Sequence, residues 1–316
     1  MKRQTVYISA LAAILLAAGC QKNGLENQNL NDGTVRYAVV MDDYTQTKGM
    51  LVNTDGSDKA LSEFATAIGN KFAARAFEGS GSTPIITQDV EWKTDKWVGT
   101  PVAYWPQATS LTFLASANLP ESEDVAKVSY ASTGVTLDYK AVPEAASAQK
   151  DILLGHYKGN GGNTGTAQIH FEHPMTAVRF LRGDIDAGLV IKSISISGVA
   201  SSGTATMDVS GAITWSGVSG YTHTVSQTKA DGLGEDGTTK LIGEPFIIIP
   251  QNLSINGVKV NVSFTDGTEV EATISSGEWQ MGKTNTYTLN IDGSIVSISP
   301  EEYNGCPLGV EMVDLA

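Results

Sequence analysis

Residues 258–274 read VKVNVSFTDGTEVEATI and decide the fold class. Apolar and polar residues alternate from Val258 to Phe264, which is the period of a strand with one buried face. The pair Asp266-Gly267 follows, and Asp-Gly supplies the positive φ angles of a tight hairpin turn. The stretch therefore predicts a β-hairpin that joins strand 258–264 to strand 270–274.

The same kind of signal recurs along the chain. Short β-prone runs, bounded by turn residues, predict further strands and a Greek-key-like sandwich in the second half. In the first half the predicted strands are 35–40, 89–93, 102–105, 111–115, 125–130 and 135–139; in the second half they are 167–181, 189–196, 205–209, 245–250 and 287–291.

One segment of the first half remains ambiguous, and one divides the chain. Leu61, Phe64, Ile68 and Phe72 recur at helical spacing, although residues 72–77 are equally compatible with a strand. Residues 159–165, GNGGNTG, form the most glycine-dense stretch and predict a domain boundary. The expected organisation is an N-terminal β-sandwich over 35–164 and a C-terminal β-sandwich over 165–316.

Composition excludes several classes of protein. A chain of 316 residues with 41% hydrophobic but only 17% charged residues, and with 33 glycines, is typical of an extracellular all-β protein. There are 34 acidic against 21 basic side chains, so the net charge is -13. This charge gives nucleic acid no electrostatic footprint to bind.

The N-terminus predicts export and lipidation. Met1-Lys2-Arg3 precedes an apolar run over 6–18, which is too short to span a membrane and is typical of a secretory signal. The run ends LAAGC at residues 16–20 and is similar to a bacterial lipobox, with Ala17 where Leu is usual. We therefore expect a signal peptide over 1–19, a covalent lipid on Cys20 and a tether over 20–34; the alternative is a plain secretory signal.

No strong catalytic or metal-binding pattern is present in the sequence. Cys306 is the only other cysteine, so we expect no disulfide. His170 and His173 lie three apart on a predicted strand and should point to opposite faces, which argues against zinc. The glycine-rich run 155–162 is interpreted as a linker rather than a phosphate loop, and 231–237 as a solvated loop rather than a calcium site. We expect no metal, no cofactor and no enzymatic activity.

Two further groups of side chains have a functional and a plain interpretation. Glu121, Glu123 and Asp124 are acid/base candidates only in the sense that any two acids are, and an exposed turn is the simpler interpretation. The first domain also contains an aromatic cluster, which would stack on sugars if exposed and would pack in the core if the residues are in strands: Trp92, Trp97, Tyr104 and Trp105.

Several short motifs follow one another in a fixed order along the chain. They are WVG at 97–99, VAYWP at 102–106, LTFLA at 111–115, DILLG at 151–155, IHFEHPMTAV at 169–178 and WQMGKTNTYTL at 279–289. Taken in this order, they resemble the fimbrillin family of Bacteroidales lipoproteins, the major and minor fimbrial subunits. The resemblance implies two tandem transthyretin-like, Greek-key β-sandwich domains in a lipoprotein pilin of the outer membrane. It also implies that a surface protease removes the first strand and that a donor strand of the next subunit fills the groove.

Mapped on this sequence, the strand to be removed is 35–40 and the cut follows Lys48, which leaves Gly49 as the new N-terminus. Family members more often have Arg at this position, and Arg36 and Arg75 are weaker candidates because both lie in segments predicted to be regular structure. An ordinary loop lysine is the alternative for Lys48.

The C-terminal tail, 307–316, predicts a donor strand. Leu308, Val310 and Met312 fall on one face of an extended segment. The alternative is that the tail packs on its own domain. The expected function is thus a fimbrial subunit at the cell surface that assembles with itself or related pilins, supports adhesion and has a host or bacterial receptor. The other function classes are a non-polymerising surface lipoprotein that binds glycans or host proteins, and a hydrolase on a β-sandwich.

Overall fold

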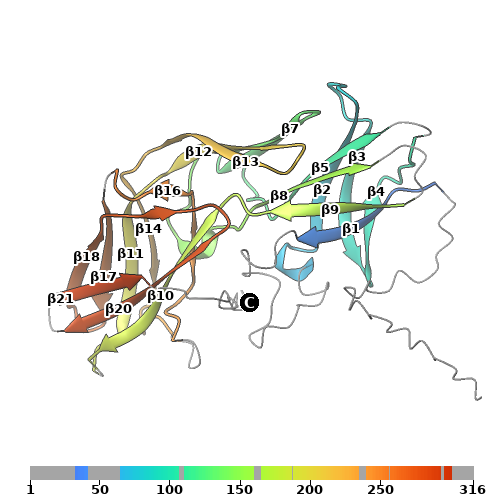
Figure 1. The fold of residues 1–316 in the computed structure, drawn as a ribbon. Helices are drawn as coiled ribbons and strands as arrows, with labels where there is room; N and C mark the ends of the chain where they lie inside the picture. Colours follow the sequence, from blue (N-terminus) through green and yellow to red (C-terminus); the bar gives the residue numbers. More distant parts are fainter. Residues whose placement is uncertain are drawn as a thin grey trace, which may run out of the picture.

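The computed structural model describes residues 33–41, 65–106, 110–159, 165–186, 188–234, 240–255, 257–292 and 295–300. The described residues are mostly strands, arranged in two groups that lie side by side (Figure 1). Helical structure among them is limited to residues 65–67 and the short 3-10 helix η1, Ala146–Ala148. The all-β prediction is confirmed, and the ambiguous segment divides into a helical turn followed by strand β2, Lys71–Glu78.

The first group of strands closes into a barrel. Its order is β1-β4-β3-β2-β5-β8-β9, and β1 pairs with β9 in parallel whereas the other neighbours are antiparallel. The sequence predicts a two-sheet β-sandwich for this part of the chain, whereas the strands close into a single barrel. The remaining bounds are Arg36–Met41 for β1, Ile86–Lys93 for β3, Lys96–Thr100 for β4, Leu111–Ala117 for β5, Leu153–Gly159 for β8 and Thr166–Glu172 for β9.

The second group contains two four-stranded sheets, β15-β10-β20-β21 and β14-β11-β17-β18, and the small pair β16-β19. Within the first of these sheets β10 and β20 are parallel. The bounds are Thr176–Ile185 (β10), Ile191–Val199 (β11), His223–Thr228 (β14), Phe246–Ile248 (β15), Gln251–Asn252 (β16), Val258–Phe264 (β17), Glu269–Ile274 (β18), Glu278–Trp279 (β19), Thr284–Asp292 (β20) and Ile295–Pro300 (β21).

A further sheet, β13-β12-β7-β6, combines strands from both halves of the sequence. β7 pairs with β12, with Leu137 opposite Ala205. Since β6 and β7 precede residue 164 and β12 and β13 follow it, this sheet contains strands from both sides of the predicted boundary. The bounds are Ala126–Ala131 (β6), Gly134–Tyr139 (β7), Ser202–Asp208 (β12) and Ile213–Ser219 (β13).

The glycine-rich stretch connects neighbouring strands of the barrel. β8 and β9 pair in antiparallel, with His156 opposite His170, so the predicted boundary between residues 164 and 165 lies inside this hairpin. The linker interpretation was wrong for residues 155–159, which belong to β8 and pair with β5. This position of the strand requires glycine, because a Cβ on Gly155 would lie 2.7 Å from Ile169 and 2.8 Å from Phe171, both buried core residues.

The hairpin over 258–274 is confirmed. Val262 pairs with Val270, and Gly267 has φ +92° in the turn between β17 and β18. Two other predicted strands differ from the structure because of proline, which lacks the N–H that a ladder needs. The run 167–181 divides into β9 and β10 around Pro174, and 102–105, between Pro101 and Pro106, forms only an isolated bridge from Tyr104 to Thr34.

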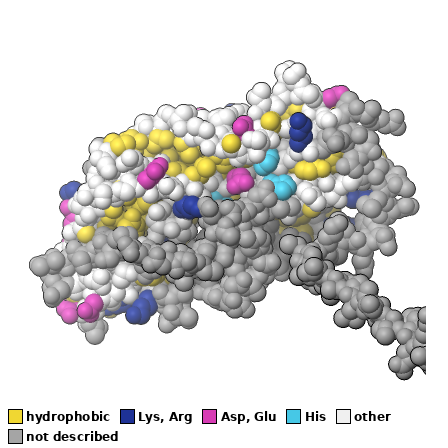
Figure 2. Space-filling view, viewed as in Figure 1, with side chains coloured by type: hydrophobic (Ala, Val, Ile, Leu, Met, Phe, Trp, Pro, Cys, Tyr) yellow, Lys and Arg dark blue, Asp and Glu magenta, His cyan; other side chains and the backbone are white. Residues whose placement is uncertain are grey.

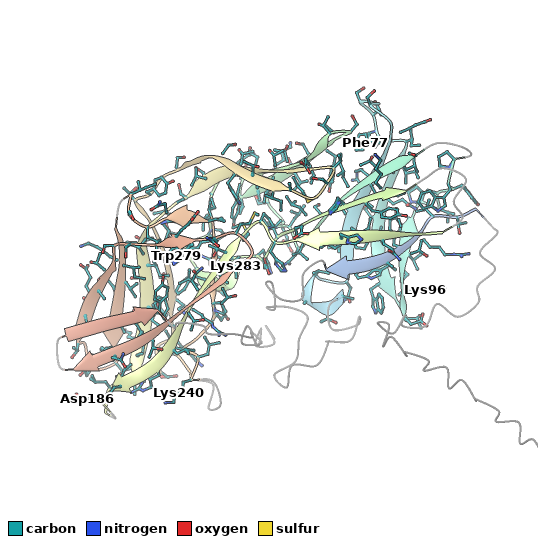
Figure 3. All side chains as sticks on the ribbon, viewed as in Figure 1. Phe77, Lys96, Asp186, Lys240, Trp279 and Lys283 are labelled. Carbon is teal, nitrogen blue, oxygen red and sulfur yellow. The ribbon has the colours of Figure 1, made fainter. Side chains whose placement is uncertain are left out.

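Each group of strands has a buried core. The barrel core is aromatic, with Phe72, Trp97, Phe113 and Phe171 among its buried residues. The other cluster lies mainly in the second group, around residues such as Trp279, and also includes Phe77 of the barrel (Figure 3). The surface view shows charged side chains of both signs scattered over this face, without a large patch of one sign (Figure 2).

Candidate functional site: the seat of strand β1

Strand β1 closes the barrel between β9 and β4 (Figure 1). Its parallel register with β9 runs from Arg36, opposite Thr166, to Met41, opposite Phe171. On the β4 side the contact is shorter: Tyr37 lies opposite Trp97, and the backbone N–H of Val35 donates to the carbonyl of Ala103 at 2.9 Å. Loss of β1 would therefore leave β9 and β4 as two open edges. We call the space between them the β1 seat.

The inner face of β1 is apolar, as a period of two requires. Tyr37 and, just before the strand, Val35 are buried, and Val39 is half-buried and packs against the barrel core. Arg36 and Ala38, which alternate with them, are half-buried. The Tyr37 ring meets Phe72 and Phe113 edge to face, with ring centres 5.7 and 6.1 Å apart. Such pairs add roughly 0.5–1.5 kcal/mol beyond the buried area, so Tyr37 anchors the strand.

A buried polar contact marks the same position. The Tyr37 hydroxyl donates to Oε1 of Gln88 at 2.5 Å, and Nε2 of Gln88 donates to the carbonyl oxygen of Pro101 at 2.5 Å. Only 1% of Gln88 is exposed. Burial raises the pKa of Tyr37 far above its usual value despite the nearby charge of Arg75. Tyr37 therefore remains a neutral O–H donor at any physiological pH.

Gly99 makes room for this contact. A Cβ on Gly99 would lie 2.6 Å from Nε2 of Gln88, so any larger residue at position 99 would displace the amide. The sequence predicts the strand but not the role of Gln88, because a glutamine in a short strand is typical of a surface position. The motif WVG at 97–99 contains Gly99, but nothing in the sequence connects this glycine to residue 88.

The site residues predicted in the N-terminal and C-terminal parts of the chain lie outside the described residues. These are the lipidation residue Cys20, the cleavage pair Lys48 and Gly49, and the donor-strand residues Leu308, Val310 and Met312. Cys306 also lies outside them, as do residues 235–237 of the loop considered as a calcium site. All of these assignments remain predictions.

The aromatic cluster mostly has a packing role. Trp97 and Trp105 are buried, and Nε1 of Trp105 donates to the carbonyl of Gly165 at 3.0 Å. Trp92 is half-buried and lies 5.2 Å from Trp97, ring centre to ring centre. Tyr104 alone of the four is exposed, at 62%.

The histidines do not gather into one site. His170 lies across the strand pair from His156, with ring centres 5.7 Å apart. His173 instead contacts the carboxylate of Asp151, with Nδ1 2.9 Å from Oδ2, and is buried. Burial acts to lower the pKa of His173, but attraction and the hydrogen bond of Asp151, helped by Glu172, outweigh it and raise the pKa. Within the described ranges, no three His, Cys, Asp or Glu side chains are placed to hold a metal ion.

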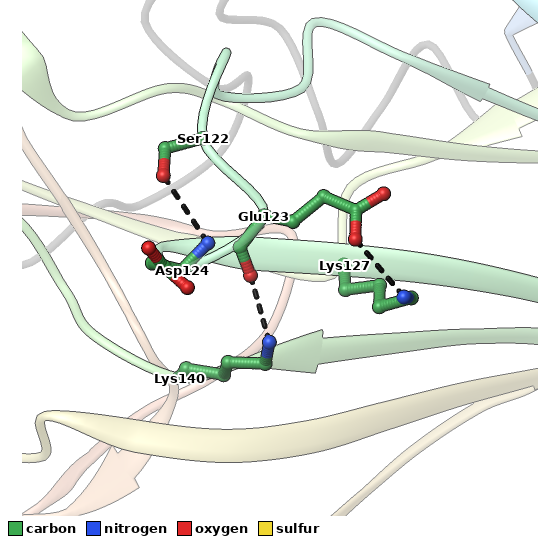
Figure 4. Close-up of polar contacts among 5 residues, drawn as sticks. All are labelled: Ser122, Glu123, Asp124, Lys127 and Lys140. Atoms are coloured by element: carbon green, nitrogen blue, oxygen red, sulfur yellow. Dashed lines mark hydrogen bonds and ion pairs between the residues drawn. The ribbon is translucent and has the colours of Figure 1, made fainter.

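The acidic group at 121–124 forms an exposed turn, as its simpler interpretation predicted. The Glu123 carboxylate pairs with Nζ of Lys127 at 2.9 Å, which lowers its pKa, and the Glu123 carbonyl accepts from Lys140 at 2.8 Å (Figure 4). The Ser122 hydroxyl accepts from the N–H of Asp124 at 3.2 Å. These contacts hold a turn and do not form a paired acid and base.

The fold is shared with solved structures of fimbrial and cell adhesion proteins from Bacteroides. A fimbrial protein from Bacteroides vulgatus superposes with a TM-score of 0.55 at 14% identity, over 85% of this chain and 98% of that chain. A candidate cell adhesion protein from Bacteroides uniformis gives 0.56 at 16% identity, over 86% and 97%. At such identities the likeness establishes the fold. Among curated proteins, none is a significant match to this sequence.

Residues 57–301 match the fimbrillin-like family. This chain therefore belongs to the fimbrillin-like family, which comprises non-enzymatic fimbrial and adhesin proteins, as its sequence motifs indicated. Family membership implies a place in cell-surface fimbriae and assembly with other fimbrial subunits. Among the described residues, no helix has the length and the apolar character needed to cross a membrane.

Proposed function

We propose that this chain is a fimbrial structural subunit whose strand β1 is removed by proteolysis and replaced by a donor strand of another subunit. The observation that carries the proposal is the position of β1. It is the chain-terminal strand of the described barrel, it closes the barrel between β9 and β4, and it buries Tyr37 together with Val35 just before the strand. A strand in this position can be exchanged without reordering the other barrel strands.

The energetics favour replacement over an empty seat. Without β1, the edges of β9 and β4 would expose unpaired backbone groups, and the apolar seat would face water. Open edges of this kind pair readily with another strand, and main-chain hydrogen bonds with alternating side-chain contacts supply the affinity. An incoming strand therefore gains the contacts that β1 gave up.

A cut after Lys48 couples assembly to release from the membrane. Under this proposal the lipid on Cys20 holds the precursor at the outer membrane. Because Cys20 and β1 both lie on the N-terminal side of Lys48, one cleavage separates the subunit from its anchor and from its first strand. Segment 307–316, with Leu308, Val310 and Met312 on one face, then enters the seat of a neighbouring subunit.

The division into two tandem domains is part of this proposal, with the closed barrel as the first domain in place of a two-sheet, transthyretin-like sandwich. We place the passage from the first to the second at residues 173–175, where the chain leaves β9 of the barrel and enters β10. The hairpin β6–β7 extends from the first domain and pairs with β12 of the second. This pairing and the core cluster that includes Phe77 join the domains.

The test is the intact mass of the protein sheared from the cell surface. A lipid-free species that starts at Gly49 supports the proposal. Lys48→Ala should abolish this species, whereas Lys59→Ala, in the same stretch between β1 and β2, should leave it unchanged. If cells yield only an acylated species that starts at Cys20, the proposal fails and a non-polymerising surface lipoprotein that binds glycans or host proteins becomes the better interpretation.

A further inference from the structure

We propose that the β1 seat selects its donor strand through Gln88: the strand must place a tyrosine, or another long side chain with an O–H or N–H donor, opposite this residue. The donor then comes from a different subunit and not from segment 307–316 of a second copy. This inference rests on the proposed function, because it concerns what replaces β1.

The orientation of the Gln88 amide is fixed by its second partner. A carbonyl oxygen accepts hydrogen bonds and cannot donate them. The carbonyl of Pro101 therefore requires the NH2 group of Gln88, and Nε2 lies 2.5 Å from it. Oε1 must then face the β1 seat, where it accepts from the Tyr37 hydroxyl at 2.5 Å. Rotation of the amide would bring two acceptors together at Pro101.

An apolar donor strand would leave this oxygen without a partner. Gln88 is 1% exposed, so no bulk water reaches it once the seat is filled. A buried acceptor that loses its donor costs its full desolvation penalty. An acidic side chain is worse, since an ionised carboxylate also lacks a proton to donate.

The surroundings favour an aromatic ring that carries the donor. The Tyr37 ring lies against Phe72 and Phe113, and Trp97 lies opposite it on β4. A short hydroxyl side chain such as serine would leave most of this space unfilled. The positions two residues before and after Tyr37 are Val35 and Val39, both packed against the core. The seat thus fits the pattern apolar, tyrosine, apolar at alternate positions.

Segment 307–316 does not have this pattern. It reads PLGVEMVDLA, and at neutral pH none of its side chains carries an O–H or N–H group. The segment therefore cannot donate a hydrogen bond to Gln88 from either face or in any register. Tyr303 precedes the segment, but its alternate neighbours are Glu301 and Gly305, which cannot replace Val35 and Val39. The seat and the segment of this chain are therefore complementary to different partners.

The test uses the chain from Gln21 onward, which leaves out the predicted lipidation residue Cys20, with a recognition site for a specific protease inserted between Lys48 and Gly49. After the cut, fragment 21–48 is held only by non-covalent contacts. Four peptides then compete for the seat, and native mass spectrometry measures replacement of the fragment. They are residues 34–42 (TVRYAVVMD), the same peptide with Tyr37→Phe, residues 307–316, and residues 307–316 with Val310→Tyr.

We expect the 34–42 peptide to replace the fragment and its Tyr37→Phe form to bind about 5- to 150-fold more weakly, the range set by one unsatisfied buried acceptor. The 307–316 peptide should not bind measurably, and Val310→Tyr should improve it. Equal binding of the Tyr and Phe peptides, or strong binding of unaltered 307–316, overturns the inference. If the 34–42 peptide itself never enters, the proposed strand exchange fails instead.

The contribution of the hydrogen bond between Tyr37 and Gln88 can also be measured without strand exchange, from the stability of the uncut chain. In the uncut chain, Tyr37→Phe should lower the urea midpoint of unfolding. Tyr157→Phe is the control, because Tyr157 packs half-buried against the same core. An unchanged midpoint for Tyr37→Phe shows that Gln88 does not need the hydroxyl and refutes the inference whatever the peptides do.

Discussion

Phe72→Ala should loosen strand β1 as well as destabilise the barrel. The Phe72 side chain is 3% exposed, and its ring contacts Tyr37 of β1, Trp97 of β4 and Phe171 of β9, with ring centres 5.7, 5.0 and 5.5 Å away. These are the strand itself and both of its neighbours. The cavity left by the substitution therefore lies directly beneath the β1 seat.

The magnitude follows from burial and ring contacts. Truncation of a buried Phe to Ala typically costs 3–5 kcal/mol. Each of the three edge-to-face contacts contributes about 0.5–1.5 kcal/mol beyond its buried area, so the upper part of that range applies. We expect a decrease of about 4–5 kcal/mol in the free energy of unfolding, measured by urea denaturation.

The matched control is Phe264→Ala. Phe264 is 1% exposed and lies on β17 in the second group of strands, so its truncation should cost a similar amount. Hydrogen exchange separates the two variants. The amides of β1 should exchange faster in Phe72→Ala and at the native rate in Phe264→Ala. A loss below about 1 kcal/mol for Phe72→Ala, or equal β1 exchange in the two variants, refutes the packing argument.

Three further predictions concern other contacts. Asp151 stabilises the cationic form of His173 and raises the pKa of His173 in the folded state. The stabilisation that this pair gives is therefore fully present below pH about 6.5 and is lost as the pH rises through the folded pKa. Asp151→Asn should accordingly lower the urea midpoint more at pH 5.5 than at pH 8.5, and an equal decrease at both pH values would contradict the charge assignment. Gly155→Ala should cost about 1–3 kcal/mol by overpacking against Ile169 and Phe171, with exposed Gly234→Ala, where a Cβ meets nothing within 4 Å, as the neutral control in the same melts. Glu123→Gln should leave the thermal midpoint unchanged, because its pair with Lys127 is fully exposed; a clear drop would show that the turn depends on this charge.

Local pattern predicted the strands that depend on local signals. The hairpin 258–274 is present as β17 and β18 because its alternation and its Asp-Gly turn act within a few residues. Strands 111–115, 125–130 and 135–139 correspond to β5, β6 and β7 for the same reason. The errors also have local causes: prolines at 101, 106 and 174 interrupt runs whose composition otherwise favours strands.

Local sequence patterns did not predict which distant segments pair with one another. The run 155–162 looks like a linker, yet residues 155–159 belong to β8, where Gly155 pairs with both β5 and β9. The β6–β7 hairpin looks like part of the first domain, yet it completes a sheet with β12 and β13. In both cases the choice of neighbour depends on which apolar faces meet, and a single sequence does not record that.

The sequence by itself determined the all-β class, the family and the identity of the strand at the candidate site, since alternation, turn residues and ordered motifs are properties of neighbouring residues. The tertiary structure decided what surrounds that strand. It placed Gln88, with Gly99 and Pro101 beside it, against Tyr37, which lies 51 positions from Gln88 in the chain. Burial makes that contact a requirement, because this acceptor cannot turn to bulk water, and among the described residues its donor is the Tyr37 hydroxyl.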